Sequence, residues 1–151
     1  MSTNSGINLL RGLVGPGGEL TGNSNLYNIR TRLTIAQINA GASLLPAVPG
    51  YKYRMIHCKA IAIGGAAGSV TTVDVLGTQA TASVKLVAFA QANLTQSAVV
   101  SAGGTGGTVL ADGASYAAND ANTAITISKT GSSIDTATAV DIIFDFALDA
   151  A

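Results

Sequence analysis

The segment from Thr138 to Leu148 alternates its residue types more regularly than any other part of the chain. One set of alternate positions is wholly apolar: Val140, Ile142, Phe144, Phe146 and Leu148. The other set holds Asp141, Ile143, Asp145, Ala147 and Asp149. A period of two is the repeat of a β-strand, whose successive side chains point to opposite faces. The segment therefore predicts a strand with one face in a core and the other face acidic.

A second long strand is expected at residues 51–63, between the turn-forming pairs Pro49-Gly50 and Gly64-Gly65. Its first half also alternates, with Tyr51, Tyr53 and Met55 on one face and Lys52 and Arg54 on the other. From residue 56 onward both faces become apolar. The strand either passes under a second layer or changes face at a β-bulge, and the sequence leaves both readings open.

Further strands are expected at residues 27–35, 70–76, 83–90, 94–100 and 123–129, and Gly77 to Gln79 reads as a turn. Residues 44–50 form a short extended piece, and Pro46 and Pro49 place it at a sheet edge because proline cannot donate to a central ladder. A helix is compatible with the pattern around residues 37 or 117. About eight strands separated by glycine-rich turns predict an all-β fold, a β-sandwich or jelly roll.

The body of the fold is expected to span residues 27–151, with residues 1–26 as a flexible N-terminal arm rich in Gly and Asn. The arm contains an apolar patch of Ile7, Leu9, Leu10, Leu13 and Val14, with Arg11 inside it. A solvated tail has little reason to carry such a patch, so it either packs back on its own domain or docks on a neighbour. We expect the arm to become ordered on assembly and to act as a tether.

Charged residues make up only 11% of the chain and are divided by sign along it. Residues 1–60 carry six Lys and Arg against one Glu, whereas residues 61–151 carry two Lys against seven Asp. The basic strand positions include Arg30, Arg32, Lys52 and Arg54. These residues either form a basic face for an acidic partner or pair with the carboxylates within the fold.

The sequence contains no recognisable set of catalytic, cofactor-binding or metal-binding residues. His57 is the single histidine, and Cys58, the single cysteine, points to the opposite side of the same strand, so the two cannot form a nucleophile and base pair. The aspartates lack the spacing of a calcium loop, and the glycines at 103–107 lack that of a phosphate loop. The balanced net charge disfavours nucleic acid as a partner, and no apolar run is long enough to predict a membrane span. We expect a protein that is not an enzyme and uses no cofactor.

The segment 33–54, LTIAQINAGASLLPAVPGYKYR, resembles capsid cement or decoration proteins of tailed bacteriophages. The resemblance extends over residues 30–90, and the rest is similar only in its Gly-, Ala- and Thr-rich strands and apolar closing strand. It implies a jelly-roll-like body on the exterior of the virion, made in the host cytoplasm and bound to the major capsid protein. It brings no catalytic residues with it.

The weakly charged surface also predicts a homo-oligomer, with a dimer favoured over a trimer. The candidate residues for contact with the capsid or another protomer are Ile7, Leu9, Leu10, Arg11, Leu13, Val14, Arg30, Arg32, Lys52 and Arg54. The alternative function is a phage head-fibre, tail, receptor-binding or carbohydrate-binding β-module. Glycan sites usually need exposed aromatic residues, and this chain has no Trp and only four Tyr.

Overall fold

A computed structural model of the chain describes residues 26–151. The described strands are β1 (Leu26–Thr34), β2 (Ser43–Leu45), β3 (Tyr51–Ile63), β4 (Val70–Gln79), β5 (Ala82–Ala90), β6 (Val99–Ser101), β7 (Gly107–Val109), β8 (Ile125–Gly131) and β9 (Ala139–Ala150). Helix α2 (Ile35–Ala40) and the 3-10 helix η2 (Ala111–Tyr116) complete this part of the chain. The expected arm, apart from its last residue, lies outside the described residues.

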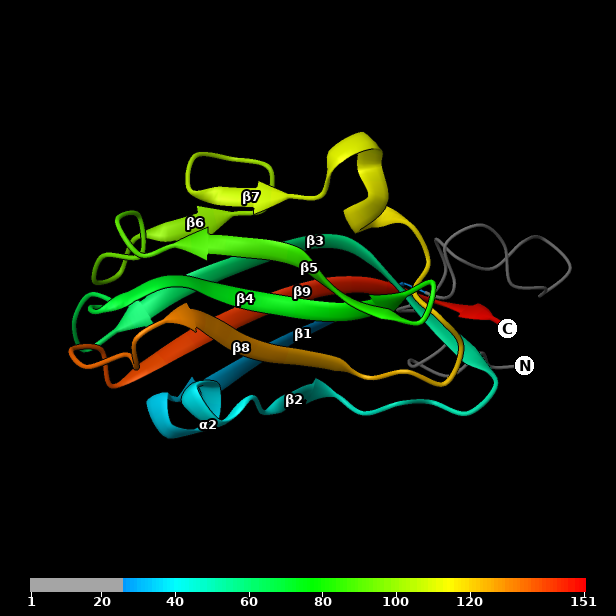
Figure 1. The fold of residues 1–151 in the computed structure, drawn as a ribbon, viewed down its shortest axis with the longest axis horizontal. Helices are drawn as coiled ribbons and strands as arrows, with labels where there is room; N and C mark the ends of the chain where they lie inside the picture. The colour runs from blue at the N-terminus through cyan, green and yellow to red at the C-terminus, as the bar shows by residue number, and fades with distance from the viewer. Residues whose placement is uncertain (1–25) are drawn as a thin grey trace, which may run out of the picture.

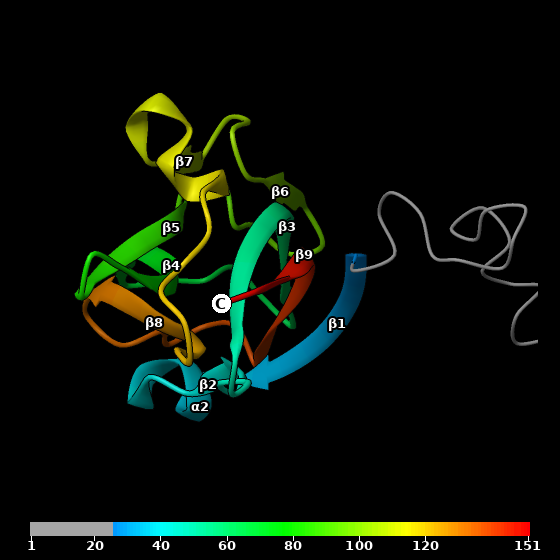
Figure 2. The same cartoon turned by 90° about the vertical axis from the view of Figure 1, so that its right-hand side faces the viewer.

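The strands form two antiparallel sheets that pack face to face (Figures 1 and 2). One sheet has the order β1-β9-β3-β6 and the other has the order β2-β8-β4-β5-β7. Apart from the short β7, the chain crosses between the sheets in the strand order of a jelly roll. The predicted all-β sandwich is confirmed, with nine strands in the described residues instead of about eight.

The two long strands recognised in the sequence pair with each other at the centre of the four-stranded sheet. Strand β9 lies between β1 and β3, and its register with β3 runs from Tyr51 opposite Ala150 to Ile63 opposite Ala139. The register shifts once, at Ile56, which is the extra residue of a β-bulge. Of the two alternatives, the change of face at a bulge is therefore confirmed. The second layer covers only the core side of the strand, and outward residues such as Ile61 and Ile63 are half-buried.

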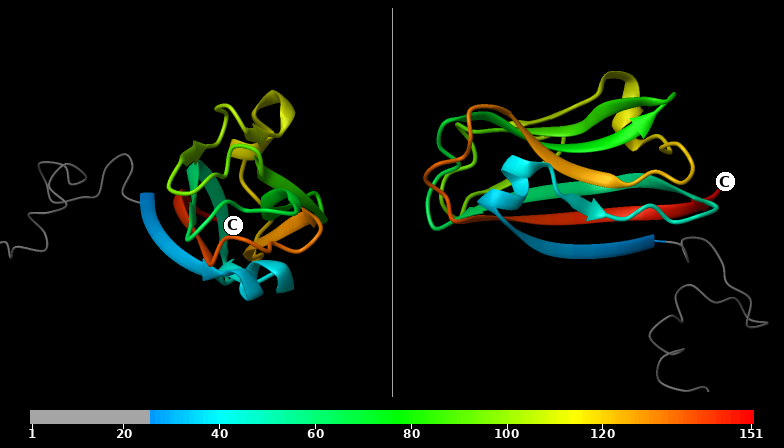
Figure 3. Two further views of the ribbon diagram at one scale, coloured as in Figure 1. Left: turned by 90° about the vertical axis from the view of Figure 1, so that its left-hand side faces the viewer. Right: turned by 60° about the horizontal axis from the view of Figure 1, so that its bottom comes forward.

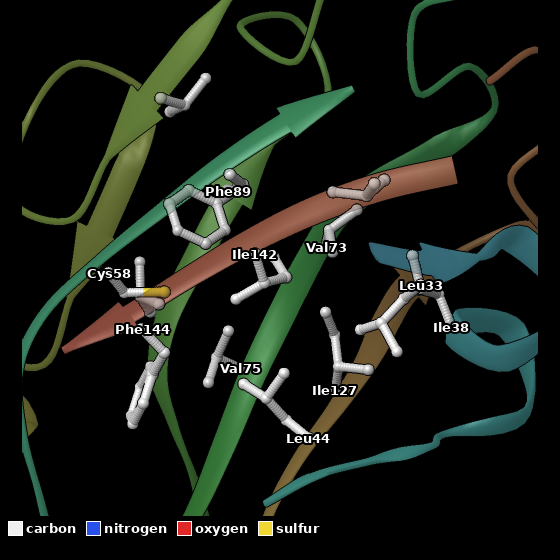
Figure 4. Packing of buried hydrophobic residues seen from close by; sticks show 14 of the residues in the cluster. Leu33, Ile38, Leu44, Cys58, Val73, Val75, Phe89, Ile127, Ile142 and Phe144 are labelled. Carbon is white, nitrogen blue, oxygen red and sulfur yellow. The ribbon is translucent and has the colours of Figure 1, made fainter. Parts of the chain in front are cut away.

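The core fills the space between the two sheets, as Figure 4 shows. Strand β9 contributes Val140, Ile142 and Phe144, all fully buried, and the facing sheet contributes a matching set. The fully buried residues of that sheet's strands are Val73, Val75, Leu86, Val87, Phe89, Ile125 and Ile127. The apolar set of the sequence pattern is thus the core-facing set, and Ile125 and Ile127 of β8 also face inward.

Residues 36–40 belong to helix α2, in agreement with the helix allowed around Gln37. Thr34 and Gln37 form a capping box, in which the Thr34 hydroxyl accepts from the Gln37 backbone N–H and the Gln37 side chain accepts from the Thr34 backbone N–H. Gly41 ends the helix at φ 79°, a left-handed conformation that glycine adopts without strain. The other helix lies at η2 and ends just before Ala117.

The turn expected at Gly77 to Gln79 is wrong, because β4 continues through these residues. A Cβ on Gly77 would lie 2.5 Å from the Asn119 side-chain oxygen, so the glycine serves close packing within a strand. The chain turns at Ala80 and Thr81 instead, whose backbone N–H groups donate to the Asp120 carboxylate at 3.1 and 2.7 Å. Neither turn residue is a glycine, which is why local composition misplaced the turn.

Two other expectations concern short strands. The extended piece before Gly50 contains β2, which forms an edge of the five-stranded sheet as predicted from its prolines. The strand expected over residues 94–100 is wrong for most of its length, because only β6, at its end, is a strand. Leu94 is instead buried in a turn in which its N–H donates to the carbonyl of Ala90.

Adjacent isoleucines on β9 provide a test of the face assignment. Ile142→Ala removes a fully buried side chain from the core and should lower the free energy of unfolding by about 2–5 kcal/mol. Ile143→Ala, on the half-buried outer side, should cost clearly less. Urea denaturation of both variants measures the difference, and equal losses would contradict the assignment.

Candidate functional site

The large exposed apolar residues of the described chain all lie on the four-stranded sheet. They are Leu26 and Tyr27 on β1, Tyr51 and Ile56 on β3, and Val99 on β6, with between 39% and 58% of each residue exposed. No comparable residue of the five-stranded sheet is exposed. This uneven distribution makes the four-stranded sheet the candidate surface for contact with another molecule.

The outer face of this sheet can be read from the strand register. It contains the alternate residues of β1, β9, β3 and β6 that point away from the core, and we call it the outer face below. All four basic residues proposed from the sequence and described here lie on it: Arg30, Arg32, Lys52 and Arg54. Leu26 and Val99 lie on it as well. The fold thus places the acidic set of β9, which is distant in the sequence, between the basic strands β1 and β3.

Arg30 and Arg32 share one carboxylate, that of Asp141 on the neighbouring strand. Arg30 Nη2 lies 2.6 Å from Asp141 Oδ2, and Arg32 donates from Nε to Oδ1 at 2.6 Å and from Nη2 to Oδ2 at 3.0 Å. The Asp141 side chain is only 1% exposed, whereas the two arginine side chains are 60% and 58% exposed. The hydrogen bonds from Arg32 and then from Arg30 outweigh the opposing effect of burial and lower the pKa of Asp141 to about 2.

A second ion pair joins Arg54 to Asp149, with Nε 2.8 Å from Oδ2 and Nη2 3.3 Å from Oδ1. Together with the pairs of Asp141, it joins the basic and acidic halves of the sequence within one domain. Lys85 and Asp74, 3.0 Å apart on the other sheet, form a further pair within the acidic half. Of the two alternatives left open, internal pairing is therefore present. The aspartates of β9 are not simply solvated charges, because Asp141 is buried in its pair.

Pairing does not neutralise the outer face. Its cations are Arg30, Arg32, Lys52, Arg54 and Lys59, and its carboxylates are Asp141, Asp145 and Asp149. The face therefore carries an excess of two positive charges, while the seven cations and seven carboxylates of residues 26–151 balance. The exposed guanidinium groups keep donors available on the solvent side, where a carboxylate of a partner could accept from them.

A hollow of about 350 Å³ opens at the start of β1. It is lined by Leu26, Tyr27, Asn28, Ile56, Asp145 and Phe146. The bulge in β3 creates one wall, because the extra residue Ile56 stands out from the sheet and is 39% exposed. Asn28 Nδ2 donates to the Asp145 carboxylate across the floor. The lining is mainly apolar with one polar pair, which suits an apolar side chain better than a charged ligand.

The residues considered for chemistry lie apart from one another. Cys58 is fully buried on the core side of β3, and burial raises the pKa of its thiol far above the ordinary value, as expected of an inert thiol. His57 is only half-buried and lies opposite Asp145 in the register. Within residues 26–151, no three metal-ligating side chains come together, and no helix is long and apolar enough to cross a membrane.

Sequence reasoning missed the apolar part of this surface. Ile56 was assigned to an apolar continuation of the strand and Val99 to a longer strand, and neither was expected to be exposed. The change of face within β3 was the available signal for Ile56, because a bulge exposes its extra residue. The arm candidates Ile7, Leu9, Leu10, Arg11, Leu13 and Val14 lie outside the described residues.

The shared carboxylate predicts a specific dependence of stability on pH. Because the folded-state pKa of Asp141 lies below its ordinary value of 3.8, the pair stabilises the fold above about pH 4, and this contribution is lost as pH falls toward 2. Asp141→Asn should lower the free energy of unfolding at pH 7 by about 1.5–3 kcal/mol and flatten its decline in acid. Urea denaturation between pH 7 and pH 2.5 measures both effects. Asp112→Asn removes an exposed charge and is the control; equal effects of the two substitutions would contradict the assignment.

Comparisons of the chain with protein-family models, curated proteins and solved structures found no significant match. No relative therefore supplies a role for the residues of the outer face. What this surface does has to be inferred from its own composition, exposure and charge.

Proposed function

We propose that this protein is a non-enzymatic cement protein that binds the exterior of a bacteriophage capsid and stabilises it. The single observation that carries the proposal is that exposed apolar side chains and unneutralised basic charge gather on one sheet while the other sheet has no exposed large apolar residue. The resemblance of residues 33–54 to phage decoration proteins gives the class of partner. The jelly-roll strand order is compatible with the role, since capsid proteins use this fold.

The chemistry of the outer face suits contact with another protein surface. Leu26, Ile56 and Val99 supply apolar area that gains free energy on burial. Arg30 and Arg32 supply planar, weakly hydrated donors, and arginine is enriched at protein interfaces for this reason. Because Asp141 already fixes both guanidinium groups, less side-chain entropy is lost when they bind. We infer that the major capsid protein presents acidic groups to this face.

The same pairing argues against nucleic acid as the partner. Affinity for a phosphate backbone rests on cations free to replace counterions, and three of the five cations of the face are already held by aspartates. The proposed location is the virion exterior, with synthesis in the host cytoplasm. No residue is assigned to catalysis or to a cofactor.

A second candidate is a glycan-binding or receptor-binding module of a phage fibre or tail. The hollow favours it, because an exposed tyrosine, Tyr27, lies beside the polar pair of Asn28 and Asp145. Aromatic rings stack on sugar rings, and carboxylates accept hydrogen bonds from sugar hydroxyl groups. This function and the proposed one differ in a simple respect: a glycan-binding module retains its affinity for cell-surface sugars when no capsid is present.

Binding to purified capsid shells lacking the protein tests the proposal. Val99→Asp places a charge at the most exposed apolar residue of the outer face and should reduce shell occupancy at least about tenfold at sub-saturating protein. Thr108→Asp makes the same charge change at an exposed position of β7, on the other sheet, and should bind like the unaltered protein. Both sites are exposed, so folding should be preserved in both variants, as circular dichroism would verify.

Two outcomes would contradict the proposal. Equal occupancy by the two variants would remove the outer face from the interface. Shells with and without the protein that resist heat and osmotic shock equally well would remove the cement role itself.

We also propose that the protein associates with itself, as a dimer in preference to a trimer. Closed symmetry is the usual outcome for soluble homo-oligomers, and the low charge of the surface opposes self-contact little. Light scattering at increasing concentration should give twice the mass of the chain. A monomer at high concentration, together with isolated monomers on the shell, would refute this expectation.

A further inference from the structure

Strand β1 leaves a long free edge on the four-stranded sheet. Its nine residues pair with β9 on one side, and no strand of the described chain pairs with the other side. The other three sheet edges are β2, β6 and β7, each of only three residues. Proteins usually cover, shorten or charge a long edge, because its unpaired backbone groups accept another strand. The edge of β1 is therefore the largest unsatisfied backbone surface in the described fold.

The core side of β1 is also incompletely covered at its start. Tyr27 lies on this side, opposite Phe146, and is 49% exposed although its ring stacks on the Phe146 ring at 5.5 Å. Ile29 is half-buried, and only Leu33, near α2, is fully covered. Figure 2 shows the reason: the start of β1 stands away from the five-stranded sheet, whereas its end approaches α2 and β2. Tyr27 and Ile29 therefore leave apolar surface uncovered on the core side of β1.

A second copy of β1 fits this edge poorly. The antiparallel pairing that uses the whole strand would set Arg30 of the two copies opposite each other. Like charges directly opposite destabilise a strand pair, and the single Asp141 beside each Arg30 and Arg32 leaves a positive excess on both copies. A strand that pairs favourably with this edge should therefore be apolar and carry little charge.

We propose that residues 7–14 of the same chain add to this edge as an antiparallel strand, which is the packing on its own domain that the sequence allowed, in place of an arm ordered only on assembly. The segment has eight residues against the nine of β1, and Arg11 is its only charge. Residues 15–25 connect it to the start of β1, with four glycines and one proline in eleven residues, a composition suited to reversing the chain. The short connection keeps the local concentration of the segment near β1 high. The segment therefore pairs with β1 of its own chain in preference to β1 of another molecule.

The hydrophobic pattern selects the register. With Leu13 opposite Tyr27 and Leu9 opposite Thr31, Ile7, Leu9 and Leu13 share the core side and cover the exposed part of β1. Arg11 falls on the same side, opposite the half-buried Ile29, where its long side chain can extend past the exposed start of β1 to solvent. A slip of one residue would turn these three apolar side chains to the other face and leave only Leu10 and Val14 as apolar side chains on the core side, so this register covers the larger apolar set. Leu10 and Val14 then join the outer face beside Leu26, widening the surface that we propose to contact the capsid. The docking itself rests on the sheet edge and not on that function.

Hydrogen exchange of the isolated full-length protein tests the added strand. In the unaltered chain, the β1 amides that point away from β9 should exchange at least tenfold more slowly than in Leu9→Asp or in a chain without residues 1–18. Leu10→Asp makes the same change at the adjacent outward position and should retain the protection. The amides of β3 should exchange equally in all four proteins, which would show that the body stays folded. Equal exchange of β1 in all four would overturn the proposal.

A disulfide then determines which chain donates the strand. Leu13→Cys combined with Tyr27→Cys should oxidise rapidly within one chain in dilute solution, giving a monomer on a non-reducing gel, while Leu10→Cys with Tyr27→Cys should oxidise at least tenfold more slowly. Cys58 is buried and should not compete. A disulfide-linked dimer would show exchange between copies and overturn the intramolecular docking. Both experiments omit capsid shells, so their failure is separate from failure of the proposed function.

Discussion

The pairing of β3 with β9 is the interaction on which the rest of this structure depends. Twelve register pairs join the two strands at the centre of the four-stranded sheet. One face of this strand pair packs in the core and the other forms part of the outer face. The inward side chains of β9, among them Ile142 and Phe144, provide one wall of the core. The outward ones, among them Asp141 and Asp149, fix the arginines of the outer face. Figure 3 shows the two strands side by side along the length of the sandwich, with β1 completing the sheet. The core and the candidate contact surface are therefore two sides of the same pair of strands.

The sequence was sufficient for those elements whose pattern is local. Strict alternation identified β9, flanking turn residues bounded β3 at both ends, and prolines placed β2 at an edge. The errors arose where the structural role of a residue depends on its contact with a residue that is distant in the sequence. Gly77 signals a turn locally, but it lies within β4 because Asn119 packs against it. The real turn at Ala80 and Thr81 depends on a carboxylate about forty residues away.

The candidate site was predictable only in part for the same reason. The four basic positions could be assigned to strand faces, but whether they met the aspartates depended on strand order. Arg32 and Asp141 are 109 residues apart and become neighbours only because β1 pairs with β9. Exposure of Ile56 required the exact position of a bulge, and exposure of Val99 required β6 to be a short strand at an edge. Such features come from sheet topology, which local periodicity does not specify.

The shared carboxylate also allows the surface that stabilises the fold to serve the proposed binding. An unpaired Arg30 and Arg32 on neighbouring outward positions would repel each other and resist desolvation by a partner. Burying Asp141 between them lowers both costs, since each guanidinium is held in place before binding and most of its surface remains exposed. In the proposed function, the excess positive charge that remains steers an acidic surface toward the face, and the apolar residues of the same sheet provide free energy once contact is made. Stability and the proposed recognition thus draw on the same ion pairs, so a substitution at Asp141 should alter both, whereas one at Val99 should alter the proposed recognition alone.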